Sequence, residues 1–166
     1  MSLADDLLSQ ANRLANLEPR RPKQASLRRA VSTSYYALFH LLTADAARRL
    51  VHSADRDFHR MFVSRSFTHS RMVEASKAFQ GGALPKSLAR SGVTVSTEVS
   101  TVADAFVFLQ QARHDADYNT GITFTRHRAE AAVRLAQTAF VAWRTARGTT
   151  DADLYLLAML LPLNRP

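Results

Sequence analysis

The stretch over residues 27–51 constrains the fold of this chain more than any other. It is the longest run without Pro or Gly that combines strong helix formers with dense apolar content. Its first half carries a stripe at helical spacing: Leu27, Val31, Ser34, Leu38 and Leu41. From Tyr35 onward, apolar residues also cover a second face. Because a helix that is apolar on more than one side is usually enclosed by neighbours, we predict that this is the central helix of an α-helical domain.

Apolar residues recur at helical spacing in several other segments. The helices predicted from this pattern cover residues 2–18, 23–52, 55–80, 97–118, 126–147 and 151–161. The third can break near residues 66–70, where Ser, Thr and His lower the helix propensity. Residues 83–97 show no clear period, so we predict a long loop there with a turn of helix at Lys86–Ala89.

Polar residues mark several of the predicted helix ends. Ser2, with Asp5 three residues later, resembles a capping box. Residues 53–55 can end the central helix and cap the next one. Thr150 or Asp151 can cap the last helix.

No segment shows a convincing strand alternation, and most connections between the predicted helices are short. The sequence therefore predicts an all-α fold: an up-and-down antiparallel helical bundle of four to five helices with a short C-terminal helix. We expect one domain, with the bundle over residues 1–148 and the C-terminal helix and tail over residues 149–166.

Composition excludes several classes of protein. The 166 residues include no Cys, which excludes disulfides, thiol catalysis and thiolate metal sites. The N-terminal residues MSLADDLLSQ are acidic where a signal peptide is basic. The longest apolar run, Leu154–Leu163, is too short to span a bilayer. We therefore expect a cytoplasmic protein that has no membrane partner.

The charge balance suits an anionic partner. The chain carries 22 basic against 14 acidic residues, a net charge of +8. Such a balance favours RNA, DNA or an acidic protein as a partner. The alternative is a genome that favours Arg codons, since only 3 of the basic residues are Lys.

Two short blocks carry sequence motifs. Residues 28–40 read RRAVSTSYYALFH, and residues 112–118 read ARHDADY. The first block is similar to the RxAxSxxYYAxF signature of the HEPN superfamily, and the second resembles the RxxADY helix end of that family. The likeness is greatest to small stand-alone bacterial and archaeal members. The order of the blocks and the helix layout extend it over roughly residues 1–147.

The HEPN resemblance implies a helical bundle that commonly forms a homodimer. Many members are metal-independent endoribonucleases, others pair with minimal nucleotidyltransferases in toxin–antitoxin-type systems, and some bind without catalysis. In active members, Arg is followed after four to six residues by His. Arg113 followed by His114 matches the start of this pattern. The place of the later His is taken by Tyr118, Asn119 and Thr120, which favours a binding or partner role.

The RxxADY block supplies the first candidate site. Arg113 and Asp117 lie four residues apart on the predicted helix, as do His114 and Tyr118. In a ribonuclease, Arg113 would stabilise the pentavalent phosphate while His114 or Tyr118 moves the proton. The alternative is structural: Arg113 and Asp117 tie this helix end to the central helix as a buried network.

Tyr35, Tyr36 and His40 on the central helix are candidate members of the same network or site. Aromatic residues at helical spacing usually belong to the core, with their hydroxyls satisfied by a nearby polar group. The second interpretation is that one of them lines a site with Arg113. In that case His40 substitutes in space for the missing histidine.

A segment after the central helix interleaves cationic and aromatic residues. It contains Arg56, His59, Arg60, Arg65, His69 and Arg71 together with Phe58, Phe62 and Phe67. One interpretation is an amphipathic helix with its phenylalanines in the core; the other is an RNA surface with aromatic stacking. The histidines follow no metal-ligand spacing, and no phosphate-binding or dinucleotide-binding glycine motif occurs, so we expect neither metal nor cofactor.

The leading hypothesis is a HEPN-like module in a binding role, associated with nucleic acid or with a nucleotidyltransferase-type partner protein. One alternative is a metal-independent endoribonuclease that uses Arg113 with Tyr118, His114 or His40. Another is a helical bundle that binds a small ligand. The apolar C-terminal run, residues 154–163, can either form an interface or pack against its own bundle.

Overall fold

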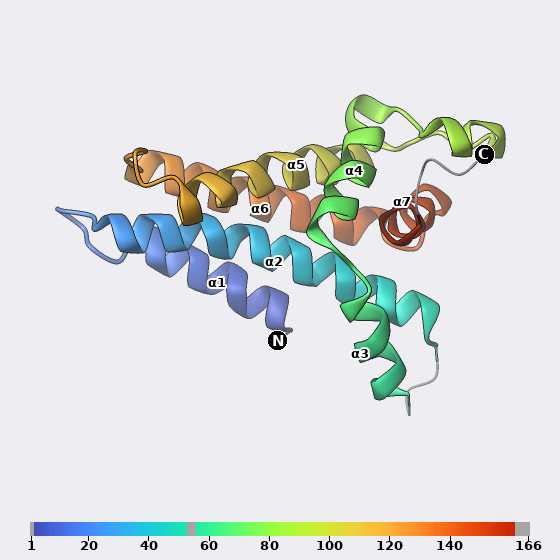
Figure 1. Ribbon diagram of the computed structural model, residues 1–166, viewed down its shortest axis with the longest axis horizontal. Coiled ribbons are helices and arrows are strands. Elements are labelled where there is room, and N and C mark those ends of the chain that lie inside the picture. Colours follow the sequence, from blue (N-terminus) through green and yellow to red (C-terminus); the bar gives the residue numbers. More distant parts are fainter. Residues whose placement is uncertain (1, 53–55, 162–166) are drawn as a thin grey trace. The chain divides into compact units, whose positions relative to one another are not determined.

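The computed structural model describes residues 2–52 and 56–161, and its regular elements are all helical (Figure 1). The helices are α1 (Leu3–Ala15), α2 (Gln24–Leu50), α3 (Asp57–Arg65), α4 (His69–Phe79), α5 (Thr97–Tyr118), α6 (Arg126–Ala146) and α7 (Thr150–Leu160). The short 3-10 segments are η1 (Gln80–Gly82) and η2 (Lys86–Ser91). No strand occurs in the described residues, so the prediction of an all-α helical bundle is confirmed.

Local sequence explains several helix ends. Ser2 and Asp5 form the predicted capping box: the Ser2 hydroxyl accepts from the Asp5 amide at 3.3 Å, and the Asp5 carboxylate accepts from the Ser2 amide at 3.1 Å. The predicted break near residues 66–70 separates α3 from α4, and the side chain of Thr68 caps α4. The predicted cap at residues 53–55 and the tail at 162–166 lie outside the described residues.

The start of α7 differs from the prediction by one or two residues. Its cap is Thr149, whose side chain accepts from the Ala152 amide, so the assignment to Thr150 or Asp151 is wrong. The carboxylate of Asp151 is already occupied, since it accepts from the Ser96 amide at 2.8 Å and from the Thr149 hydroxyl at 2.5 Å. These hydrogen bonds outweigh burial, which alone would raise the pKa of Asp151, and hold that pKa below its usual value.

Residue contacts divide the chain into two compact units. Unit 1 comprises Met1–His40 and Ala105–Val141, and unit 2 comprises Leu41–Asp104 and Ala142–Pro166. Helices α2, α5 and α6 each contribute residues to both units. The expected division into a bundle over residues 1–148 and a C-terminal element over residues 149–166 stays a prediction.

Unit 1 encloses the first part of the central helix, α2. Between Ala30 and Leu38 every residue except Tyr36 is buried, which agrees with a helix that is covered on more than one side. The largest buried side chains of this unit are Tyr35, Phe106, Phe124, Phe140, Leu27, Leu38 and Leu109. The ring centroids of Tyr35 and Phe106 lie 5.4 Å apart, which joins α2 to α5 in this core.

Unit 2 is built around the packing of α4 against α7. Tyr155 of α7 is fully buried between Phe79 and Trp143, at ring-centroid distances of 5.1 and 6.3 Å. Its hydroxyl lies 2.7 Å from the Ser76 hydroxyl, and burial raises the pKa of Tyr155 well above its usual value. Much of the apolar C-terminal run therefore packs within its own unit. Leu157 and Leu161 are exposed exceptions.

None of the helices in the described part of the chain combines the length and the apolar content that crossing a bilayer requires.

Candidate functional site

The guanidinium of Arg113 is the centre of the sequence-predicted site in unit 1. Its side chain is only 15% exposed. Nε lies 2.9 Å from Asp117 Oδ2, an ion pair, although the N–H is not aligned for a hydrogen bond to that oxygen. NH2 donates to the Tyr36 hydroxyl at 2.8 Å. Arg113 therefore joins two groups that the sequence placed near it, one on its own helix and one on α2.

Three tyrosine rings surround the same guanidinium. Its carbon lies 5.4, 5.5 and 5.9 Å from the ring centroids of Tyr36, Tyr118 and Tyr35. Burial alone would lower the pKa of Arg113. The hydrogen bond with Tyr36 and the charge of Asp117 more than offset burial, so the pKa of Arg113 is raised. The group stays cationic, and its charge is balanced inside the protein.

Two further α2 residues extend this contact toward the end of α5. Ser32 donates to Asp117 Oδ2 at 3.2 Å. Arg28 donates to the carbonyl oxygens of Ala116, Asn119 and Ile122 at 2.9, 3.0 and 2.5 Å. A cation that binds the last carbonyls of a helix also stabilises the negative end of the helix dipole.

The spacing of polar residues in the first motif block has a structural explanation. Arg28, Ser32 and Tyr36 follow each other every four residues, so they form one ridge of α2. Each of them bonds the C-terminal half of α5 or the turn after it. The sequence indicated Tyr36 for this role but missed Arg28 and Ser32, although the spacing of four residues was a usable signal.

The remaining predicted residues of unit 1 differ in exposure. Tyr118 is 64% exposed, and its ring centroid lies 5.3 Å from that of the exposed His114. Tyr35 is fully buried, and burial raises the pKa of its hydroxyl well above the usual value. His40 is partly buried one turn beyond Tyr36, edge-on to Phe39 at 5.4 Å, and burial lowers its pKa. His40 thus continues the ridge on which Tyr36 lies.

Helix α3 in unit 2 contradicts the prediction that its phenylalanines face the core. Phe58 and Phe62 are 69% and 67% exposed, and no residue of this fully described helix is buried. Only Phe67, beyond the end of α3, is buried as predicted. The pattern failed because a spacing of four residues fixes a shared helix face and does not fix what covers that face. Arg56 and Arg65 at the two ends of α3 are also exposed.

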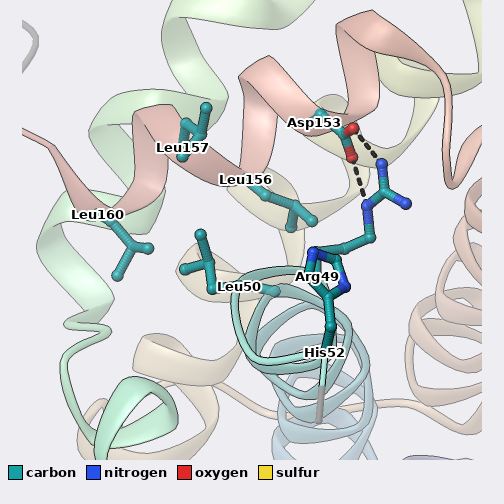
Figure 2. Close-up of a pocket in the computed structure, with 8 residues that line it drawn as sticks. Arg49, Leu50, His52, Asp153, Leu156, Leu157 and Leu160 are labelled. Carbon is teal, nitrogen blue, oxygen red and sulfur yellow. Dashed lines mark hydrogen bonds and ion pairs between the residues drawn. The ribbon is translucent and has the colours of Figure 1, made fainter. Parts of the chain in front are cut away.

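Unit 2 also contains a leucine-lined hollow between the end of α2 and α7 (Figure 2). The hollow has a volume of about 290 Å³. Its walls are Ala46, Arg49, Leu50, His52, Asp153, Leu156, Leu157 and Leu160. At one edge Arg49 and Asp153 form a two-point ion pair, in which Arg49 Nε donates to Asp153 Oδ1 at 2.9 Å. The sequence did not indicate this hollow, since its walls come from residues about a hundred positions apart.

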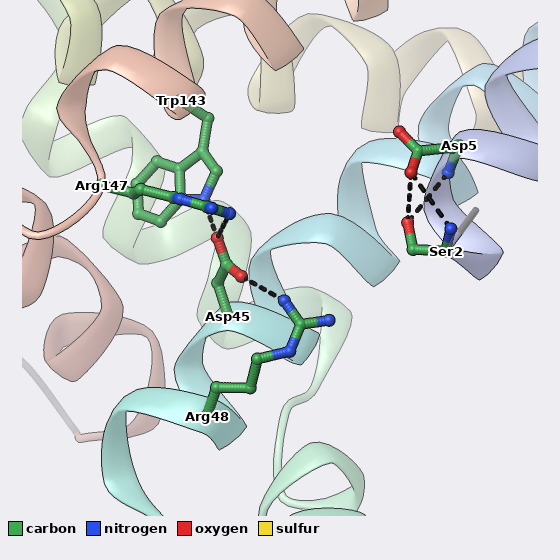
Figure 3. Close-up of polar contacts among 6 residues, drawn as sticks. All are labelled: Ser2, Asp5, Asp45, Arg48, Trp143 and Arg147. Atoms are coloured by element: carbon green, nitrogen blue, oxygen red, sulfur yellow. Dashed lines mark hydrogen bonds and ion pairs between the residues drawn. The ribbon is translucent and has the colours of Figure 1, made fainter. Parts of the chain in front are cut away.

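A second hollow, of about 270 Å³, shares Arg49, Asp153 and Leu156 with the first. The remaining residues that line it are Asp45, Arg48, Trp143, Arg147 and Gly148. The Asp45 carboxylate is buried there and accepts from the Trp143 indole N–H at 2.7 Å (Figure 3). Arg48 and Arg147 approach the same carboxylate at 2.8 and 3.6 Å, and the side chain of each is 55% exposed. Each guanidinium has five N–H donors, and about half of each side chain is open to solvent.

Metal chemistry gains no support from the geometry. In residues 2–52 and 56–161, no group of three or more His, Asp or Glu side chains is placed to hold a metal ion. Comparisons with protein-family models, with curated proteins and with solved structures give no match to this chain.

Proposed function

We propose that the protein is a non-catalytic helical module that binds single-stranded RNA through α3. The observation that carries this proposal is the exposure of Phe58 and Phe62, which lie one helical turn apart. Exposed aromatic rings flanked by cations are the usual means of binding an unpaired strand, because bases stack on the rings and phosphates contact the cations. The net charge of +8 and the HEPN-like motif blocks support the same choice.

The cations on α3 suit this role. Residues 56–65 carry three arginines, at positions 56, 60 and 65, and one acidic residue, Asp57, which is 3.5 Å from Arg60. Arg60 is also occupied by the Val51 carbonyl, to which its Nε donates at 3.2 Å. Arg56 and Arg65, which are both exposed, are thus the cations that we expect to contact phosphates.

The contacts of Arg113 argue against catalysis. A guanidinium that stabilises a phosphorane must present its donors to the substrate. Arg113 instead is paired with Asp117, donates to Tyr36 and is largely buried. Its raised pKa and its surroundings fit a group that stabilises the fold.

Fluorescence anisotropy with a short labelled single-stranded RNA tests the binding proposal. We expect Phe58→Ala and Phe62→Ala each to weaken binding about tenfold, because one stacked base contributes about 1–3 kcal/mol. Phe108→Ala is the matched control, since Phe108 is 59% exposed but lies on α5. Arg65→Gln should reduce the salt slope by about 0.7, the value for one phosphate contact. Salt-insensitive binding, or equal losses in all three Phe variants, would contradict the proposal.

A metal-independent endoribonuclease is the second candidate, favoured by the exposed pair of His114 and Tyr118, whose rings lie in contact beside Arg113. Labelled RNA incubated with the protein in EDTA should stay intact if the module only binds. Cleavage that is lost in His114→Ala and Tyr118→Phe, but kept in Phe108→Ala, would support the enzyme instead. His40→Ala tests whether that residue replaces the missing histidine. These variants separate chemistry from folding better than Arg113→Ala, which removes a buried network.

Homodimer formation and pairing with a nucleotidyltransferase-type partner stay predictions from the resemblance. Neither is needed for binding through α3.

A further inference from the structure

The two adjoining hollows of unit 2 differ in chemical character. The first hollow has leucines on both of its helices (Figure 2), whereas the second is lined by three arginines, of which Figure 3 shows Arg48 and Arg147 beside Asp45. They share the Arg49–Asp153 pair and Leu156 as a common wall. We propose that together they bind a small amphiphilic anion, with its carboxylate or phosphate head group among the arginines and its alkyl chain in the leucine-lined hollow. This site is independent of RNA binding through α3.

The cationic hollow has an excess of positive charge. Three arginines, at positions 48, 49 and 147, line it together with two aspartates, Asp45 and Asp153. Both aspartates are occupied: Asp45 by Trp143 and Arg48, and Asp153 by Arg49. A guanidinium has five N–H donors, and the arginines are about half exposed, so donors remain for a further acceptor. A singly charged oxygen-bearing head group would balance the remaining charge.

The leucine-lined hollow suits an alkyl chain. Leu50 of α2 faces Leu156, Leu157 and Leu160 of α7 across it (Figure 2). Among the described residues that line it there is one imidazole, His52, and no Phe, Tyr or Trp. Its volume of about 290 Å³ is roughly twice that of an apolar cavity of about 150 Å³ that holds benzene. An alkyl chain of about ten carbons is therefore of suitable size.

The two hollows meet at Arg49, Asp153 and Leu156, so a molecule that crosses this edge would have its head group in one hollow and its chain in the other. Arg49 and Asp153 satisfy each other through two contacts and keep the Arg49 guanidinium at the boundary of apolar and cationic walls. A ligand with only a head group leaves the leucines in water, and one with only a chain leaves the arginines without a further anion. Binding energy is greatest when both parts are filled.

Isothermal titration calorimetry of the full chain with decanoate and with decyl phosphate tests the site. We expect saturable one-to-one binding of at least one of them, and the tighter one identifies the head group. Octanoate should bind about fifteenfold more weakly than decanoate, because it lacks two methylenes and each buried methylene contributes about a fourfold factor. Decanol, inorganic phosphate and acetate are the probes that lack one of the two parts, and each should bind far more weakly.

Variants on the two walls locate the binding. Arg147→Gln should weaken decanoate binding about tenfold through the head group. Leu50→Trp should weaken it at least as much, because the larger side chain fills the hollow. Both side chains are about half exposed, and circular dichroism melts will show that the variants fold. Arg90→Gln, on the exposed segment η2, is the charge control and should leave binding unchanged.

Three results would overturn the proposal. The first is no binding of either decyl ligand to the folded protein. The second is equal binding of decanol and decanoate, or no effect of Arg147→Gln and Leu50→Trp, since the ligand would then lie elsewhere. The third is adenosine monophosphate displacing decanoate at equal concentration, which would rule out an alkyl-selective hollow.

Discussion

Arg113 in unit 1 and Asp45 in unit 2 are both charges with little exposure to solvent, but their partners are arranged in opposite ways. Arg113 is a cation inside the protein, surrounded by Asp117 and by three tyrosine rings. Asp45 is an anion inside the protein, and its ionic partners Arg48 and Arg147 extend into solvent. The positive charge of Arg113 is therefore enclosed by protein groups, whereas the charges of Arg48 and Arg147 are presented to solvent.

This difference separates arginines that stabilise the fold from arginines that are able to bind a ligand. An enclosed guanidinium has its charge paired inside the protein, and removing it leaves a partner without its counter-charge. A presented guanidinium loses little when its ion pair is broken, because water replaces the partner. The sequence motif pointed to Arg113, whereas the geometry places the accessible cationic cluster in unit 2.

The largest effect should come from removing the buried anion of unit 2. Asp45→Ala is expected to lower the free energy of unfolding by about 3 kcal/mol, since it leaves the buried Trp143 N–H unpaired and two arginines close together. Urea unfolding followed by circular dichroism measures the change. Asp45→Asn, which keeps an acceptor for Trp143, should recover part of the loss. Asp57→Ala, on an aspartate that is 90% exposed, is the control.

Removing the buried cation of unit 1 should come next. Arg113→Ala is expected to cost about 2 kcal/mol, less than Asp45→Ala because Asp117 is partly exposed and can be hydrated. Arg113→Lys keeps the charge but loses the planar contacts with the tyrosine rings, so it should recover only part of the stability. Thermal melts of both variants measure this. Full stability of Arg113→Ala would mean that the residue is not structural and would reopen the catalytic interpretation.

Much of unit 1 could be predicted from the sequence because its contacts repeat at helical spacing. The period of four residues placed Arg113 beside Asp117, and the aromatic stripe of α2 identified Tyr35 as a core residue. The helices themselves followed from apolar periodicity and end signals, such as Ser2 with Asp5. Spacing along one helix is a local property, so the sequence carries it directly.

Unit 2 was harder to predict from the sequence because its contacts join distant parts of the chain. Asp45 and Trp143 are 98 residues apart, and Arg49 and Asp153 are 104 apart, so no motif links them. The error at Phe58 and Phe62 has the same origin: periodicity shows which residues share a face, whereas burial depends on what packs against it. The hollows of unit 2 depend on such tertiary placement throughout.

An intermediate effect is expected at Arg28, an arginine that sequence reasoning missed. Arg28→Gln should destabilise the protein by about 1.5 kcal/mol, because the carbonyls at the end of α5 lose a charged donor and most of them can be hydrated instead. Hydrogen exchange should show the loss as faster exchange at the end of α5. Arg29→Gln is the matched control, since Arg29 is the next residue in the chain and is exposed. Equal effects of the two variants would show that the carbonyl contacts do not stabilise this helix end.

The smallest effect on stability should be at Arg147. This variant distinguishes most directly between the enclosed cation of unit 1 and the exposed cations of unit 2. Its side chain is 55% exposed and lies 3.6 Å from Asp45, so Arg147→Gln should change the free energy of unfolding by less than about 0.5 kcal/mol. The same substitution should weaken decanoate binding about tenfold, a combination that Arg113→Ala cannot show. Urea unfolding and calorimetry on one preparation measure both quantities. If Arg147→Gln instead destabilised the protein as much as Asp45→Ala, the arginine would belong to the fold, and the contrast between enclosed and presented cations would fail.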